Sequence, residues 1–225
     1  MTDINRNEHE RAGAYFDRKG DLFDSLYSPD HVSPVMRFLN RHFRSDIYER
    51  YRLTMEHLKA TGAASLLDIG IGSARYAEGY LNAGVNRIVG VDISSTMLEI
   101  ARKHVQGLPD ADAKIEFVLS DINEFESQEK FDVVVAMGFF DYTPDPVKCL
   151  SRMRSFSSHS VIASFPSISV YRTPIRKIRY QVKNCPVYFY RRGEIERISV
   201  ESGFSKCQIS KIRGAGMDYV AVFFK

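Results

Sequence analysis

The stretch "LLDIGIGSARYAEGYL", residues 66–81, decides the fold class of this chain. An apolar run leads to Asp68, and Gly70 and Gly72 follow with one residue between them. The apolar run predicts a buried strand, and the segment after the glycines predicts a helix. A glycine-rich turn from a strand into a helix is typical of ligand sites in open α/β sheets. The stretch therefore predicts an α/β fold with a ligand at this turn.

The alternation of strands and helices continues along the chain. Strands are predicted over residues 65–70, 87–93, 114–121, 131–138, 159–166, 206–214 and 218–224, and helices over residues 73–84, 94–105, 145–156 and 191–204. Strands that alternate with helices form a parallel sheet that is covered on both faces. The last two strands follow each other directly, which predicts an antiparallel pair. The expected fold is a doubly wound, mostly parallel, seven-stranded sheet of Rossmann-like type.

Two segments lie outside this alternation. Residues 1–62 are predicted to form an N-terminal helical extension, which either covers the bound ligand as a lid or simply packs on the sheet. Residues 63–225 form the ligand-binding domain, and residues 167–190 are inserted in it after the fifth strand. The insertion is basic and rich in aromatic residues, with no acidic residue before Glu194. It is either a solvated helix or a surface for an anionic partner.

Composition excludes several classes of protein. The chain has 225 residues with a formal net charge of +3, too little to indicate nucleic-acid binding. Its three cysteines, Cys149, Cys185 and Cys207, have neither a disulfide pattern nor a zinc-site spacing. The polar N-terminus does not resemble a secretory signal, and no apolar stretch approaches the roughly 20 residues that span a bilayer. A cytoplasmic location is expected, peripheral to a membrane surface if the insertion binds lipid.

The glycine loop does not fit the two common phosphate-binding motifs. A dinucleotide fingerprint needs a third glycine, but the loop reads Gly70-Ile71-Gly72-Ser73-Ala74-Arg75. A P-loop needs the sequence Gly-Lys-Ser/Thr, which is absent here. Asp68 would also repel a phosphate, because like charges repel.

Three acidic residues instead indicate a different nucleoside ligand. Asp92 ends the second strand, where a carboxylate can accept hydrogen bonds from both ribose hydroxyls. Asp121 ends the third strand, where it can accept from the amine of adenine or serve as a turn residue. The carboxyl ends of parallel strands share one edge, so both acids should lie near Asp68. S-adenosylmethionine has a ribose, an adenine and a cationic tail that suit these positions.

The motifs resemble those of class I S-adenosylmethionine-dependent methyltransferases. The resemblance spans residues 65–166 and rests on "LLDIGIGSA", "VGVDIS", "LSDI" and "FDVVVAMGFFDYTPDP". Ala74 replaces the third glycine of the family pattern. The N-terminal "YFDRKGDLFDSLY" is more weakly similar to small-molecule O-methyltransferases of tetrapyrrole and quinone biosynthesis.

The resemblance implies a role for each motif residue. Gly70 and Gly72 would line the methionine part of the cofactor, with Asp68 acting on its ammonium group directly or through water. Asp92 would hold the ribose. The remaining cofactor residues would be Ile93 and Met97 beside the adenine, Asp121 and the Ile122 backbone at its edge, and Met137 with Gly138 beside the sulfonium. Met97 fits the hydrophobic core equally well.

The expected reaction is methyl transfer to a small-molecule acceptor, with oxygen favoured over nitrogen and S-adenosylhomocysteine as the product. The sulfonium is already activated, so no metal is expected, and a base is needed only for a weakly acidic hydroxyl. Asp141 and Tyr142 are the candidate bases, with His159 a weaker one. Substrate or another anion is expected at basic residues of the insertion, Arg172, Arg176 and Arg179. Two alternatives stay open: an RNA or protein methyltransferase, and a non-catalytic cofactor-binding scaffold. The oligomeric state is not predicted.

Overall fold

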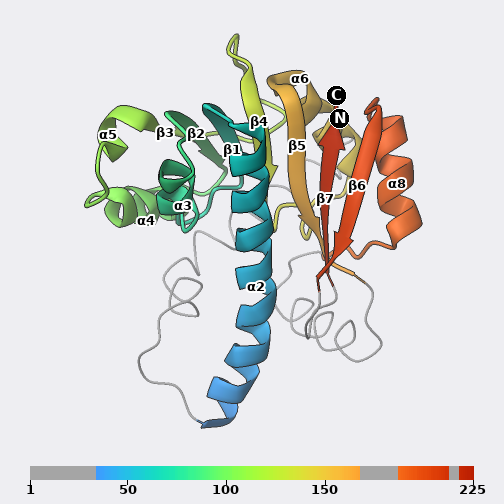
Figure 1. The fold of residues 1–225 in the computed structure, drawn as a ribbon, viewed down its shortest axis with the longest axis horizontal. Helices are drawn as coiled ribbons and strands as arrows, with labels where there is room; N and C mark the ends of the chain where they lie inside the picture. The colour runs from blue at the N-terminus through green and yellow to red at the C-terminus, as the bar shows by residue number, and fades with distance from the viewer. Residues whose placement is uncertain (1–33, 168–186, 213–217) are drawn as a thin grey trace.

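A computed structural model describes residues 34–167, 187–212 and 218–225, with side chains from residue 47 onward. The strands form one seven-stranded sheet in the order β3-β2-β1-β4-β5-β7-β6 (Figure 1). Their bounds are β1 Ser65–Ile69, β2 Arg87–Asp92, β3 Ile115–Leu119, β4 Phe131–Ala136, β5 Ser157–Phe165, β6 Lys206–Lys211 and β7 Tyr219–Phe224. Strands β1 to β5 pair in parallel, whereas β7 is antiparallel to both β5 and β6. The predicted sheet is confirmed, including its antiparallel final pair.

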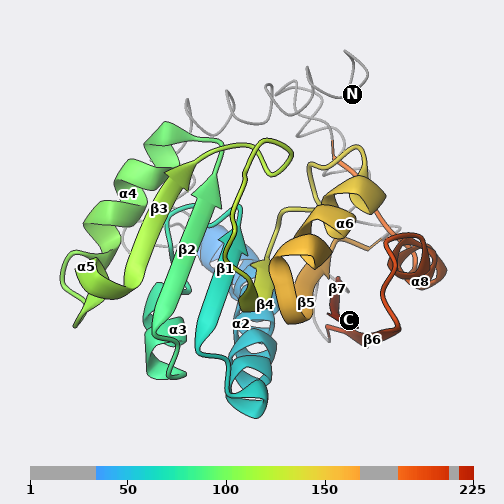
Figure 2. The same cartoon turned by 90° about the horizontal axis from the view of Figure 1, so that it is seen from above.

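Helices cover both faces of this sheet. Their bounds are α2 Pro34–Thr61, α3 Ala77–Asn82, α4 Ser95–Val105, α5 Ala111–Lys114, α6 Pro146–Phe156 and α8 Arg192–Glu201. Leu58 of α2 and Tyr80 of α3 share a buried cluster with Leu66 and Val133 on one face. Leu150 of α6 and Ile195 of α8 belong to the buried cluster on the other face. Seen from above, α2 and α3 lie on one side of the sheet and α6 lies on the other (Figure 2).

The sequence explains why the central strands are buried. Strands β2 and β4 each contain three β-branched residues among six, and all but one residue in each is buried. A strand that is covered on both faces reads as a continuous apolar run, because neither face meets water. The edge strand β3 instead alternates half-buried and exposed residues, and Leu119 at its end is 58% exposed.

Two local predictions were wrong. Helix α3 begins at Ala77 and not at residue 73, because Gly70, Gly72 and Ala74 take positive φ angles of 75°, 57° and 56° that no α-helix contains. The short helix α5 precedes β3 and was not predicted. The loop after β1 is therefore longer than expected, and it lies at the carboxyl end of that strand.

Helix α2 joins the N-terminal extension to the sheet. It has 28 residues, and its N-terminal half continues past the carboxyl ends of the strands (Figure 1). It packs closely on α3 at Gly79, where an added Cβ would lie 2.7 Å from Met55 Sδ and closer still to Tyr51 Oη. Glycine is required here because two helices approach each other at this point. The N-terminal half of α2 thus lies on the side of the sheet where the ligand was predicted.

Candidate cofactor and acceptor site

The glycine loop and the end of β2 form one connected structure. The backbone amides of Gly70 and Ile71 donate to the carbonyl of Val91 over 2.8 and 3.2 Å. The amide of Gly72 donates to Oδ2 of Asp92 over 2.8 Å. The loop is therefore folded back onto the strand that carries the predicted ribose acid. Two residues that lie 20 positions apart in the sequence meet in one site.

Asp92 is held in place by backbone groups on both of its oxygens. Its Oδ1 accepts from the amide of Ser94 over 2.9 Å, while its Oδ2 accepts from Gly72. The hydroxyl of Ser94 accepts from the amide of Met97 and so begins helix α4. A carboxylate has about four acceptor positions, so two backbone donors leave it the capacity to accept ribose hydroxyls. The side chain sits at the rim of the core, 9% exposed.

Asp68 lies deeper, and its pKa is unusual. It is 5% exposed, and its Oδ2 accepts a hydrogen bond of 2.8 Å from the hydroxyl of Tyr80. Burial raises the pKa of Asp68 to about 7, the Tyr80 hydrogen bond lowers it, and the charge of Asp92 raises it. A buried acid of this kind gains much from a cation, because the cation favours its charged form. The ammonium of S-adenosylmethionine is such a cation.

The loop glycines pack closely against neighbouring side chains beside these acids. An added Cβ at Gly70 would lie 3.4 Å from the ring of Phe139, and one at Gly72 would lie 3.4 Å from Met97 Cε. Met97 is 3% exposed, so it belongs to the core, with its terminal methyl directly beneath the loop. The residues present thus fit a cofactor that passes over the loop.

The next predicted residues lie around the same edge with different local roles. Asp121 accepts hydrogen bonds of 2.7 and 2.8 Å from the amide and side chain of Asn123, so it does act as a turn residue. The side chain of Ile122 is buried in the core, 3% exposed, and that of Ile93 is half-buried. Met137 is half-buried after β4.

The loop after β4 carries the two candidate bases. Tyr142 closes a turn by donating its amide to the carbonyl of Phe139 over 3.2 Å. Asp141 accepts at its carbonyl from the amide of Tyr188 over 2.9 Å. Both side chains are half-buried. Asp141 therefore lies where the chain returns from the insertion.

An ion pair at this edge was not predicted. Arg50 of α2 contacts Asp218, just before β7, with 2.5 Å between Nη2 and Oδ2. Asp218 also accepts from the amide of Ser167 over 3.0 Å and is fully buried. Burial lowers the pKa of Arg50, but the charges of Asp218 and Asp141 outweigh it and raise that pKa above its usual value. No sequence pattern connects residues 168 positions apart, so this pair appears only in the folded chain.

The basic residues of the insertion, Arg172, Arg176 and Arg179, lie outside the described residues. The two ends of the insertion are described. Ser167 forms a bridge with Tyr190, whose amide donates to the carbonyl of Pro166 over 2.8 Å. The insertion thus leaves and rejoins the sheet beside Asp141 and Asp218.

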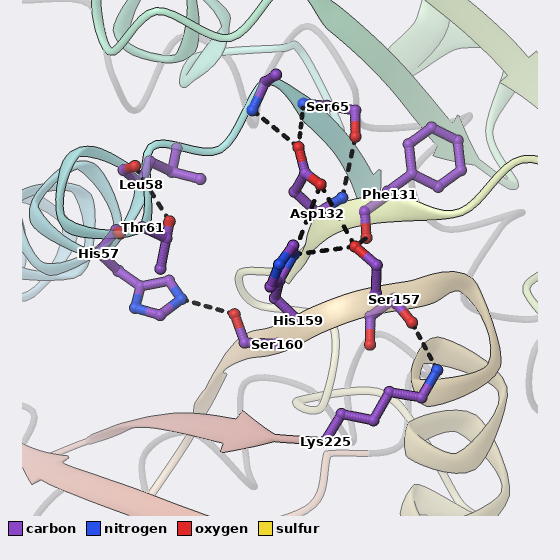
Figure 3. Close-up of polar contacts among 12 residues, drawn as sticks. His57, Leu58, Thr61, Ser65, Phe131, Asp132, Ser157, His159, Ser160 and Lys225 are labelled. Carbon is purple, nitrogen blue, oxygen red and sulfur yellow. Dashed lines mark hydrogen bonds and ion pairs between the residues drawn. The ribbon is translucent and has the colours of Figure 1, made fainter.

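The third candidate base, His159, lies far from this site. It is at the start of β5, on the amino edge of the sheet, where it is 70% exposed (Figure 3). Its Nδ1 lies 3.0 Å from Ser158 Oγ and 3.5 Å from Asp132 Oδ1. Both partners meet the same ring nitrogen, so these residues do not form a catalytic triad.

Other features of the described residues do not define a second site. A cavity of about 330 Å³ lies beneath the connection from β3 to β4, where Arg87 pairs with Glu116 and Glu129. Within residues 34–167, 187–212 and 218–225, no cluster of three or more histidine, cysteine or acidic side chains is placed to hold a metal. In the same part of the chain, no helix has the length and apolarity needed to cross a membrane.

Comparison with known proteins agrees with this geometry. Residues 67–156 match the family described as "Methyltransferase domain". A ubiquinone biosynthesis O-methyltransferase of Actinobacillus pleuropneumoniae is 27% identical over 126 residues, covering 52% of this chain and 52% of that protein. A tRNA adenine-N6 methyltransferase of Phocaeicola vulgatus is 33% identical over 107 residues, covering 48% and 44% respectively. The chain spans about half the length of these curated relatives.

The solved structures extend the likeness to nearly the whole chain. Magnesium protoporphyrin IX methyltransferase from Synechocystis, crystallised with S-adenosylhomocysteine, superposes with a TM-score of 0.77. The superposition covers 97% of this chain and 99% of that one at 18% identity, which establishes the fold. Together with the motif residues that gather at the carboxyl edge, these findings identify residues 67–156 as a methyltransferase domain within a class I S-adenosylmethionine-dependent methyltransferase fold.

Proposed function

We propose that this protein transfers the methyl group of S-adenosylmethionine to an oxygen atom of a small-molecule acceptor. The observation that carries the proposal is the position of the insertion, whose two ends join the sheet beside Asp141 and Asp218. An acceptor that binds at these anchoring points would meet Asp141, one of the two candidate bases. The ubiquinone and magnesium protoporphyrin enzymes, both named for small-molecule acceptors, support this choice.

The cofactor residues act mainly by binding and orienting. When bound, S-adenosylmethionine supplies a methyl group that its sulfonium has already activated. Asp92 accepts hydrogen bonds from the ribose, Asp68 receives the ammonium, and the glycine loop allows close approach of the backbone. Asp121 and the Ile122 backbone would read the adenine, with Ile93 beside its ring and Met137 near the sulfonium. Rate acceleration then comes from holding nucleophile and methyl group in line.

The acceptor side would supply the base. Asp141 or Tyr142 takes the proton of the acceptor hydroxyl, because a neutral hydroxyl is a weak nucleophile. Phe139, beside Gly70, contributes an apolar wall that excludes water from the methyl group. We assign Arg172, Arg176 and Arg179 to an anionic group on the acceptor or to a lipid surface that presents it. Residues 1–62 would cover the bound cofactor. The protein would be cytoplasmic and would bind to the lipid surface from outside the bilayer.

RNA is the second candidate acceptor. The observation that favours it is the tRNA methyltransferase relative, which at 33% is more identical to this chain than the O-methyltransferase is at 27%. That match covers only 48% of this chain, so it carries less weight than the position of the insertion. A protein acceptor and a non-catalytic scaffold are further outcomes of the same experiment.

The test is a transfer assay with the full chain and methyl-labelled S-adenosylmethionine. Metabolite, lipid, RNA and protein fractions of a cell extract are offered separately, and each is assayed for label. We expect label in the metabolite or lipid fraction, on a product that releases methanol or an O-methyl fragment. Label in RNA or protein would contradict the small-molecule proposal. Absence of label from every fraction, with cofactor binding intact, would favour the scaffold. Asp92→Ala is the matched control, since it should remove all transfer.

A further inference from the structure

Tyr80 contacts the cofactor acid from a position that the sequence motifs do not mark. It lies in α3, its side chain is fully buried, and its hydroxyl donates to Asp68 Oδ2 over 2.8 Å. Among the described residues, no ion pair is formed by Asp68, and Tyr80 is its hydrogen-bond donor. The phenol therefore determines where the carboxylate points.

The position of this hydroxyl is set by a stack of three tyrosines that begins in α2. The ring of Tyr51 meets that of Tyr76 edge-to-face at 5.2 Å, and the ring of Tyr76 meets that of Tyr80 at 6.1 Å. Gly79 allows Tyr51 to approach α3 closely. Aromatic rings packed in this way have little freedom to rotate. The Tyr80 hydroxyl is consequently held in one place by the contact between two helices.

The charged and titratable groups around Asp68 come from four elements. Asp92 at the end of β2 opposes its ionisation, and Tyr80 of α3 favours it. Tyr76, just before α3, and Tyr51 of α2 act on Tyr80, whose own pKa burial and Asp68 raise well above its usual value. Arg50 of α2 lies beside Tyr76 and pairs with Asp218. Tyr80 thus stays protonated and remains a hydrogen-bond donor at every physiological pH.

We propose that Tyr80 is a positioning residue for cofactor binding: its hydroxyl holds the charged carboxylate of Asp68 in place to receive the ammonium group of S-adenosylmethionine. The proposal rests on the assignment of Asp68 to that ammonium in the proposed function. It does not depend on the identity of the acceptor. Tyr80 acts through Asp68 and does not itself touch the cofactor.

The predicted consequence is a change in the pH dependence of cofactor affinity. Burial raises the pKa of Asp68 to about 7, and the Tyr80 hydrogen bond lowers it. Removing the hydroxyl therefore raises that pKa further, so less of Asp68 is charged at neutral pH. Below the pKa of both proteins Asp68 is protonated with or without Tyr80, so their affinities should converge. A general loss of structure would instead lower affinity equally at every pH.

The experiment measures binding of S-adenosylhomocysteine to the full chain by calorimetry between pH 5.5 and pH 8. For Tyr80→Phe we expect a loss of about tenfold in affinity at pH 8, since a hydrogen bond to a charged group is removed, and convergence with the wild type at pH 5.5. Tyr51→Phe is the matched control, because it removes a hydroxyl from the same stack and should change affinity by less than about twofold. Thermal unfolding checks that each variant is folded.

A double-mutant cycle with Asp68→Asn separates the proposal from the assignment on which it rests. In the Asp68→Asn background, Tyr80→Phe should have no further effect, since the charge that it positions is gone. A tenfold loss that persists in that background, or that is equal at every pH, would overturn the role of Tyr80 alone. If Asp68→Asn bound S-adenosylhomocysteine at pH 8 as tightly as the wild type does, the assignment of Asp68 to the ammonium would be overturned. The role of Tyr80, which rests on that assignment, would then be overturned too.

Discussion

The two edges of the sheet each carry a conspicuous carboxylate, and the two acids are held in opposite ways. At the amino edge, Asp132 is 30% exposed and its Oδ2 accepts from the amides of Ala64 and Ser65 over 2.9 and 3.0 Å (Figure 3). At the carboxyl edge, Asp68 is buried and accepts from Tyr80. Burial raises the pKa of Asp132, but its hydrogen bonds outweigh this and lower it overall, whereas burial raises the pKa of Asp68 to about 7.

The difference separates an acid that stabilises the fold from one that we propose to bind the ammonium group of the cofactor. The hydrogen bonds of Asp132, a residue of β4, hold the segment that connects α2 to β1 against β4. Other polar groups at the amino edge also have hydrogen-bond partners within the protein. His57 Nε2 lies 2.8 Å from Ser160 Oγ, and Lys225 Nζ donates to the Ser157 carbonyl over 2.8 Å. Asp68 instead lacks a cation among the described residues, and this lowers stability until a cationic ligand binds.

The largest expected effect is that of Asp92→Ala on the carboxyl edge. The change removes the acceptor for the ribose hydroxyls and also releases the Gly72 and Ser94 amides. We expect cofactor affinity to fall by at least about 100-fold, since two hydrogen bonds to a charged group are lost. Calorimetry with S-adenosylmethionine measures it. Asp132→Ala should reduce thermal stability and leave this affinity intact, and equal losses of affinity in the two variants would break the comparison between the edges.

Asp68→Asn should stabilise the cofactor-free protein at high pH. The folded pKa of about 7 lies above the ordinary value of 3.8, so the folded state keeps a proton that the unfolded state loses between these values. In the wild type, the protonated Asp68 contributes its full stability below pH 4. This contribution to the free energy of unfolding, at most about 4 kcal/mol, is lost as the pH rises through 7. Asparagine carries no charge and can still accept from Tyr80, so the variant avoids this loss.

Denaturant unfolding at pH 5 and pH 8 measures this effect. The stability gained by Asp68→Asn should be larger at pH 8, while cofactor affinity falls. Asp132→Asn should instead lose stability equally at pH 5 and pH 8, because an acid with a lowered pKa contributes its full stability above its unfolded pKa of 3.8 and loses it only as the pH falls through the folded value. An Asp68→Asn variant less stable than the wild type at pH 8 would show that the buried charge is compensated in the free protein.

Gly90→Ala tests whether the glycine loop depends on the strand beneath it. An added Cβ in β2 would overlap the Cδ1 methyl of Ile71 and lie 3.0 Å from its Cγ2. The side chain of Ile71 must then shift, and we expect a loss of about 1–3 kcal/mol in stability together with weaker cofactor binding. Gly107→Ala is the matched control, since nothing lies within 4 Å of the Cβ there. Equal binding in both variants would show that the loop adapts to the added methyl.

The smallest effect is expected for Ala74→Gly, at the position where the family pattern has its third glycine. Ala74 has a φ of 56°, a left-handed conformation that costs an ordinary residue about 1–2 kcal/mol. Glycine removes this strain but makes the unfolded chain more flexible, so the net gain should be about 0.5–1 kcal/mol. Thermal unfolding measures it. A loss of stability would mean that the buried Ala74 methyl contributes more through packing than the backbone strain costs.

The predicted fold depended on patterns that are local in the sequence. In the sequence, a buried parallel strand is a run of apolar residues and a helix is a segment with periodic apolar residues. Each such segment ends where the polypeptide turns. For the same reason the three acids could be placed on one edge, because parallel strands end on the same side of a sheet. The start of α3 was misplaced because Ala74 does not indicate a left-handed backbone as glycine would.

By itself, the sequence determined the seven-stranded α/β sheet, the cofactor class and the positions of Asp68 and Asp92, since these follow from motifs within a single strand and turn. Only the tertiary structure decided how those acids behave. The hydrogen bond from Tyr80, the ion pair of Arg50 with Asp218 and the anchoring of the insertion beside Asp141 all join different elements. The pKa of an acid depends on its burial and on its neighbours in space, and neither exists until the chain has folded.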